Sequence, residues 1–273
     1  MRLLAILFAL LAAGMPRAGG EVSVAYAASL VRVMEGPLAQ ALARDTGLRF
    51  EGDGKGSKAL AHLISAGLLV PDVFLCADTA LLEELRKETP AKLRGYTMFG
   101  SARMVIAYSR HSRYAGAFAR AGRLRKPLLP ILANPAVRVG RTDPLLDPKG
   151  ARTLRAIALL GKHEHAPATA SAVAAKAAMF PEEDLAVRVE TGELDAGFFY
   201  STEVPGRDLK VIQLPADSNL STLIVYGIAI VSGAAHPDAA RAFVRYVVRG
   251  KGKALLEAAG VRYFAHPEIA GRP

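Results

Sequence analysis

Short apolar segments alternate with longer amphipathic segments along the chain, and this order predicts alternating strands and helices. In the first half, the predicted strands cover residues 22–27, 48–51, 71–75 and 103–108. The predicted helices cover residues 30–46, 58–66 and 79–87, and a Gly-rich turn is expected at 52–57. Such an alternation is typical of an α/β fold with a mostly parallel sheet.

The second half repeats this pattern. Its predicted strands cover residues 138–141, 195–199, 211–214 and 225–231, and its predicted helices cover 151–160, 182–192, 237–249 and 251–259. A complete α/β block therefore separates the two strong strands at 103–108 and 225–231. This predicts a first lobe formed by 21–102 and 228–273, a second lobe formed by 103–227, and a cleft between them. The two lobes would be joined by a hinge of two crossing strands.

The first twenty residues have the pattern of a secretory signal peptide. Arg2 precedes an apolar run over residues 3–13, and small residues with a Pro follow. The run is shorter than the roughly 20 residues that a membrane span needs. We therefore expect an exported, periplasmic protein whose signal peptide occupies residues 1–20.

Composition narrows the possible ligands. The chain has 35 Lys plus Arg against 25 Asp plus Glu, a formal net charge of +10, so a general positive field favours small anions. Its densest basic cluster, at 120–126, has no interleaved aromatic residues, which argues against nucleic acid as a partner. A single Cys excludes an internal disulfide and a Cys-rich metal site.

Candidate chemistry lies where predicted strands meet helices. Ala28 and Ser29 follow the first strand, and Ser57 follows the Gly-rich segment. A helix N-terminus presents unpaired N–H groups and the positive end of the helix dipole, so both positions suit an anion. The alternative for each Ser is an ordinary helix cap.

The second half contributes a loop and a tyrosine. The loop 142–150 carries Asp147, Lys149 and Gly150, and Tyr200 ends a predicted strand. The alternative to ligand binding for Asp147 is a simple cap of the next helix. The alternative for Tyr200 is a buried side chain that is hydrogen-bonded to the backbone.

Five motifs occur in a fixed order: A-x-S, G-x-G-S, D-P-x-x-D-P-x-G, G-E-L-D-A-G-F-x-Y-S and Y-G-I-A-I-V. In this order the chain resembles the molybdate/tungstate-binding proteins of ABC importers. The resemblance implies a type II periplasmic binding fold, a bound molybdate or tungstate, an ABC importer permease as partner, and a monomer. It implies no cofactor and no catalysis.

The same resemblance implies roles for particular residues. Ser29 and Ser57, with Ala28 beside them, match the donors of the first lobe. The loop from Asp147 through Lys149 to Gly150 matches the ligand loop of the second lobe. Tyr200 matches a ligand-facing tyrosine, and the helix start at Glu182 matches a backbone donor.

Two positions depart from the branch of the family that binds its metal with six ligands. Phe199 stands where that branch has a glutamate, and Lys149 adds a cation to the loop. Asp147 would therefore contact the metal centre only if the oxyanion expands its coordination. We predict a four-coordinate oxyanion, with Asp147 turned away to cap the next helix.

Other functions have weaker support. Another oxyanion, sulfate or phosphate, remains an alternative ligand. A secreted serine hydrolase is disfavoured because neither Ser lies in a G-x-S-x-G elbow. A metal-cation carrier is disfavoured because His163 and His165, two residues apart, would not share a helix face.

Overall fold

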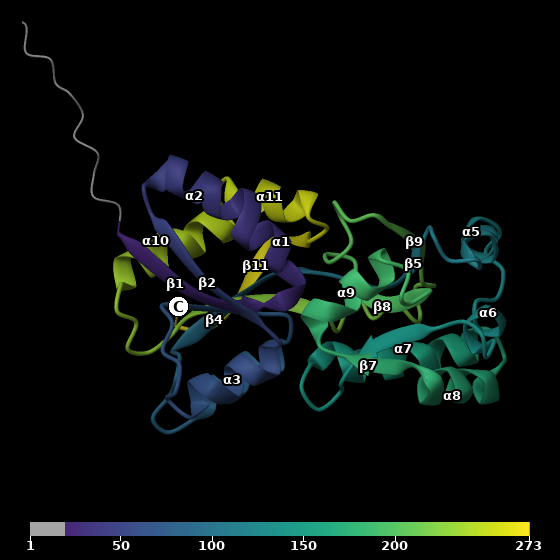
Figure 1. Ribbon diagram of the computed structural model, residues 1–273. Coiled ribbons are helices and arrows are strands. Elements are labelled where there is room, and N and C mark those ends of the chain that lie inside the picture. The colour runs from purple at the N-terminus through teal and green to yellow at the C-terminus, as the bar shows by residue number, and fades with distance from the viewer. Residues whose placement is uncertain (1–19, 273) are drawn as a thin grey trace, which may run out of the picture.

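The computed structural model describes residues 20–272, without the side chain of Glu183, and shows two α/β lobes side by side (Figure 1). The first lobe holds a six-stranded sheet in the order β11-β4-β10-β3-β1-β2, and the second holds a five-stranded sheet in the order β7-β6-β8-β5-β9. The predicted signal peptide lies outside the described residues, apart from Gly20.

The strands of the first sheet are β1 (Glu21–Ala27), β2 (Arg49–Lys55), β3 (Val73–Cys76), β4 (Gly95–Ser101), β10 (Val225–Ile230) and β11 (Arg262–Gly271). Those of the second sheet are β5 (Met104–Ser109), β6 (Val139–Thr142), β7 (Ala178–Phe180), β8 (Ala196–Tyr200) and β9 (Leu209–Gln213). Strands β4, β7 and β11 have no counterpart among the predicted elements.

The helices of the first lobe are α3 (Ser57–Ser65), α4 (Thr79–Lys87), α10 (Pro237–Val248), α11 (Gly252–Ala258) and the segments that replace the predicted helix 30–46. Those segments are η1 (Ala28–Leu30), α1 (Val31–Val33), η2 (Met34–Leu38) and α2 (Ala39–Thr46). The break lies at Gly36, whose φ of −100° and ψ of −108° are not helical, next to Pro37, which lacks an N–H.

The helices of the second lobe are α5 (Ala115–Leu124), α6 (Leu129–Ala133), α7 (Pro148–His163), α8 (Pro167–Lys176) and α9 (Glu182–Glu190). Helix α7 begins three residues before the predicted helix at 151–160 because Asp147 caps it. Within residues 20–272, no helix is both long and apolar enough to cross a membrane.

The sheets are mixed, so the expectation of a mostly parallel sheet is wrong. Strand β1 is parallel to β2 and β3, and β6 is parallel to β7 and β8. Strand β10 is antiparallel to β3 and β4, and β5 is antiparallel to β8 and β9. The antiparallel strands β5 and β10 are those that follow the two crossings between the lobes.

The two crossings lie side by side. The first joins β4 to β5 and the second joins β9 to β10 through residues 214–224. Ala102 donates its N–H to the Ile224 carbonyl at 3.0 Å, and Met104 donates to the Asn219 carbonyl at 2.7 Å. The predicted boundary at 227/228 falls inside β10, so the second crossing comes earlier in the chain.

The predicted Gly-rich turn at 52–57 is also wrong, because residues up to Lys55 continue β2. The Tyr26 ring of β1 lies across this part of the strand. A Cβ atom on Gly54 would lie 2.8 Å from that ring, and one on Gly52 would lie 2.9 Å from it. The glycines therefore make room for a neighbouring aromatic ring.

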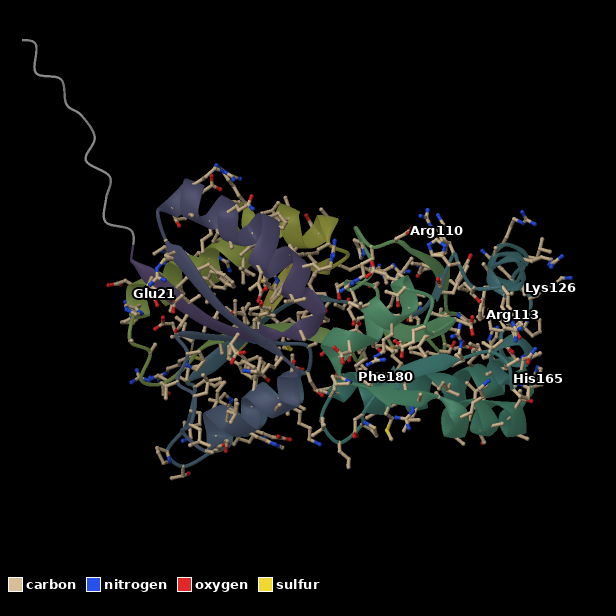
Figure 2. All side chains as sticks on the ribbon, viewed as in Figure 1. Glu21, Arg110, Arg113, Lys126, His165 and Phe180 are labelled. Atoms are coloured by element: carbon tan, nitrogen blue, oxygen red, sulfur yellow. The ribbon has the colours of Figure 1, made fainter. Side chains whose placement is uncertain are left out.

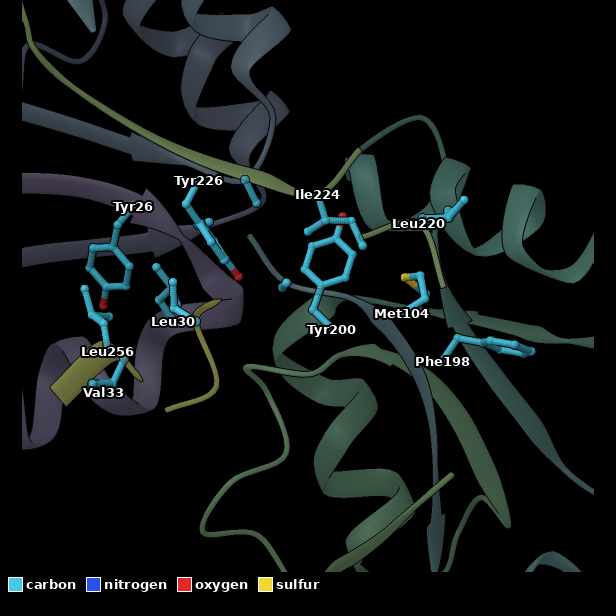
Figure 3. Packing of buried hydrophobic residues seen from close by; sticks show 14 of the residues in the cluster. Tyr26, Leu30, Val33, Met104, Phe198, Tyr200, Leu220, Ile224, Tyr226 and Leu256 are labelled. Atoms are coloured by element: carbon cyan, nitrogen blue, oxygen red, sulfur yellow. The ribbon is translucent and has the colours of Figure 1, made fainter. Parts of the chain in front are cut away.

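A single buried apolar cluster includes residues of both lobes. Figure 3 shows Tyr226 of β10 between Tyr26 of the first lobe and Tyr200 of the second, with Ile224 of the second crossing next to Tyr200 in this view. Apolar packing therefore continues across the hinge from one lobe to the other.

Candidate functional site

Ser29 and Ser57 lie together because their strands are paired. Strands β1 and β2 run parallel, and Ala27 lies opposite Lys55 in their register. Each Ser follows its strand by two residues and is buried, with 4% and 3% of its surface exposed. Both hydroxyls therefore reach the same edge of the first sheet.

Neither Ser acts as a helix cap. The residues before η1 and α3, Ala27 and Gly56, hold the capping positions, and no side chain caps either helix. The Ser29 hydroxyl lies 3.0 Å from the Tyr226 hydroxyl. The Ser57 hydroxyl accepts from the Ala77 N–H at 3.3 Å, so its own hydrogen is free to donate. The partners of both hydroxyls also differ from those of a hydrolase, since neither is a histidine.

The second lobe meets this edge through Asp147. Its Oδ1 accepts the Lys149 N–H at 2.8 Å and so caps α7, as predicted. Its Oδ2 is buried and accepts no hydrogen bond from the described residues. A Cβ atom on Gly56 would lie 3.1 Å from the Leu146 carbonyl oxygen, so the lobes touch here.

Gly150 allows the preceding loop to pack closely against the first turn of α7. A Cβ atom there would lie 2.4 Å from the Asp143 carbonyl carbon and the Pro144 nitrogen. Any side chain would displace the loop that carries Asp147. The structure thus gives Gly150 a packing role in this loop.

Lys149 is held by two buried glutamates. Its Nζ lies 2.5 Å from Oε1 of Glu203 and 3.2 Å from Oε1 of Glu182, and its side chain has no exposed surface. Despite burial, which opposes the charge, the two carboxylates raise the pKa of Lys149. The predicted cation of the ligand loop is therefore engaged within the second lobe.

The pKa values of the two glutamates are also raised, which favours their neutral form. Burial, and then the neighbouring Asp147 carboxylate, raises the pKa of Glu182 well above its usual range. Burial likewise raises the pKa of Glu203, although Lys149 and the Tyr200 N–H oppose the shift. Because residue 199 is Phe, no carboxylate precedes Tyr200 in the chain. Glu182 instead supplies a carboxylate beside Asp147.

Tyr200 is buried at the end of β8, and its hydroxyl accepts from Nη1 of Arg152 at 3.1 Å. This contact is to a side chain, so the alternative of a Tyr bonded only to backbone does not hold. Burial raises the pKa of the Tyr200 phenol well above its usual value, so the group stays protonated. Its hydrogen has no acceptor among the described side chains and remains able to donate.

Helix α9, which begins at Glu182, contacts η1, which contains Ala28 and Ser29. Residues of both lobes also line a cavity of about 360 Å³, among them Gly56, Asp147, Phe180 and Glu182. Figure 2 shows Phe180 on the side of the second lobe that faces the first, with Lys126 and His165 at the far end. The basic cluster at 120–126 is therefore remote from this site.

Five residues that were not predicted belong to this network. Arg152, Glu203 and Tyr226 contact Tyr200, Lys149 and Ser29, respectively. Asp78 pairs with Arg152, and Thr202 contacts Tyr226. Tyr226 lies 2.9 Å from the Thr202 hydroxyl as well as contacting Ser29, so it links the two lobes. The sequence contains one indication that Lys149 and Arg152 need partners. Lys149 and Arg152 lie in the first turns of α7, where a positive charge opposes the helix dipole and needs a partner.

The structure gives no support to metal-cation binding through the histidines. His163 Nδ1 lies 2.9 Å from Asp217 in an exposed pair. Over residues 20–272, no group of three or more His, Cys, Asp or Glu side chains is placed to hold a metal ion.

Sequence comparison agrees with this architecture, in which two lobes are joined by two crossings and buried hydrogen-bond donors lie where the lobes meet. The profile of the bacterial extracellular solute-binding proteins matches residues 22–262. The chain belongs to this family.

Named relatives of this solute-binding protein include two archaeal proteins. A putative ABC transporter molybdenum-binding protein of Haloferax volcanii is 32% identical over 64% of this chain, a match that spans about half (54%) of the relative. The molybdate/tungstate-binding protein WtpA of Pyrococcus abyssi is 26% identical over 82% of this chain and 78% of its own length.

The fold also matches a solved structure. The periplasmic molybdate-binding protein of Azotobacter vinelandii superposes with a TM-score of 0.70, covering 89% of this chain and 98% of that one, at 19% identity. This likeness confirms the type II periplasmic binding architecture for the solute-binding protein.

Proposed function

We propose that this protein captures molybdate or tungstate in the periplasm and delivers it, as a monomer, to the permease of an ABC importer. The observation that carries the proposal is the pair of buried hydroxyls, Ser29 and Ser57, at neighbouring strand ends. Neither caps a helix. Helix α9 of the second lobe contacts η1, which contains Ser29, and Gly56, next to Ser57, lies against Leu146 and Asp147 of the second lobe. The printed functions of the two archaeal relatives support the choice of ligand.

Neutral donors suit a fully deprotonated oxyanion. Hydroxyls and helix N-termini donate hydrogen bonds without needing an opposite charge. Since Ser29 and Ser57 belong to one lobe and Tyr200 to the other, the shell is complete only when the lobes close. Ligand binding would then favour the closed form.

A thermal-shift screen of the mature protein tests the ligand. Molybdate or tungstate at about 100 times its Kd should add about 2.7 kcal/mol of stability. For a chain of this length that corresponds to a melting shift of about 5–10 °C. Sulfate, phosphate, chromate and divalent cations complete the screen.

Phosphate is the informative comparison, because of Asp147. Its Oδ2 is buried and accepts no hydrogen bond from the described residues, so a protonated oxyanion could donate to it, in competition with the neighbouring Glu182 carboxyl, whose pKa Asp147 helps to raise. A shift with phosphate larger than with molybdate would therefore replace the proposed ligand with a protonated oxyanion. Equal shifts with sulfate and molybdate would equally refute the assignment.

A further inference from the structure

Arg152 occupies a position that joins three parts of the molecule. Its guanidinium donates from Nη1 to the Tyr200 hydroxyl at 3.1 Å and from Nη2 to the Leu223 carbonyl at 2.9 Å. Nη2 also lies 3.0 Å from Oδ2 of Asp78. Tyr200 belongs to the second lobe, Leu223 to the second crossing and Asp78 to the first lobe.

The contacts of Arg152 with Tyr200 and Asp78 are largely shielded from water. The Arg152 side chain is 11% exposed and that of Asp78 is 28% exposed. A planar guanidinium can hold several acceptors in fixed directions, which an ammonium cannot do. The geometry therefore depends on arginine and not only on a positive charge.

We propose that Arg152 is a positioning residue that orients the Tyr200 hydroxyl as a donor and, through Asp78, ties that orientation to closure of the lobes. The inference rests on the proposed function. Because Arg152 donates to the Tyr200 oxygen, the phenolic hydrogen turns away from the guanidinium and toward an acceptor in the cleft. Because Asp78 comes from the opposite lobe, its pair with Arg152 stabilises the closed arrangement with or without a ligand.

Calorimetry with sodium molybdate and sodium tungstate tests the positioning role. Arg152→Gln and Tyr200→Phe should each weaken binding about ten- to a hundred-fold, the effect of losing a hydrogen bond to a charged ligand. If Arg152 acts through Tyr200, the double variant should be within about threefold of the weaker single variant. Additive losses, or full affinity in Arg152→Gln, would overturn the proposal.

Two further variants separate the geometry of the Arg152 side chain from its charge. Arg152→Lys keeps the positive charge but loses the planar guanidinium that holds several acceptors at once. Its affinity for the anion should therefore lie between those of wild type and Arg152→Gln. Arg155→Gln removes an exposed arginine from the same helix and should bind as wild type does. If Arg155→Gln and Arg152→Gln lose affinity equally, general charge explains the effect and the proposal fails.

Asp78→Asn isolates the contact between the lobes. Asp78 Oδ1 also caps α4 by accepting from the Ala80 N–H, and Asn retains that capping ability. In small-angle X-ray scattering, the ligand-free variant should have a larger radius of gyration than wild type. Unchanged scattering would refute the closure link.

The two measurements separate the two proposals. If wild type binds neither anion, the proposed function fails, and scattering of Asp78→Asn still decides the closure link. If wild type binds but the Arg152 variants bind equally well, the proposed function stands and the positioning role fails.

Discussion

Replacing Lys149 by Met should destabilise the protein strongly, because it leaves two glutamates buried without their partner. Glu182 and Glu203 are 7% and 6% exposed, and Lys149 contacts both while itself fully buried. Removing one partner of a buried ion pair costs about 3–5 kcal/mol. Met fills much of the same space, so the loss would come from charge and not from a cavity.

The loss should grow with pH. Burial already raises the pKa of both glutamates, and removing the cation raises each pKa further. The folded variant then binds more protons than the unfolded chain above the ordinary carboxyl pKa, so its stability falls as pH rises toward the folded pKa values. With two titrating glutamates, the free energy of unfolding falls by up to about 2.7 kcal/mol per pH unit.

Urea unfolding followed by circular dichroism at about pH 5 and about pH 8 measures this difference against wild type. Lys162→Met, an exposed change on the same helix, should cost less than about 1 kcal/mol at both pH values. A loss in Lys149→Met that is small, or equal at both pH values, would refute the argument that the glutamates are buried charges held by Lys149.

The remaining predictions concern the ligand. Ser29→Ala and Ser57→Ala should each weaken oxyanion binding by about 1.5–3 kcal/mol in calorimetry with an unchanged circular dichroism spectrum, and normal affinity in both would contradict their role as donors. Asp147→Asn keeps the cap of α7 and should change affinity less than about tenfold, about 1.4 kcal/mol, with a four-coordinate centre in X-ray absorption spectra. A six-coordinate spectrum together with a large loss in Asp147→Asn would show instead that Asp147 binds the metal.

Part of the site could be predicted because it depends on local pattern. Buried strands followed by amphipathic segments place Ser29 and Ser57 at strand ends, and Asp147 before a Pro is a recognisable cap. The contacts among distant residues could not be predicted in this way. Lys149 and Glu203 lie 54 positions apart in the chain, and nothing near either one identifies the other.

Hydrophobic periodicity alone thus determined the α/β alternation, the two lobes and most of the helices, because it records which face of each element is buried. Only the tertiary structure decided strand direction, the course of β2 past Tyr26, and the partners of each buried charge. Whether a residue is buried can be predicted from the hydrophobic pattern of its neighbours in the sequence. Which residue it contacts depends on how distant elements of the chain pack. Arg152 shows the difference: its place in the first turns of α7 indicates that it needs acceptors, and only the closed lobes show that Tyr200 and Asp78 supply them.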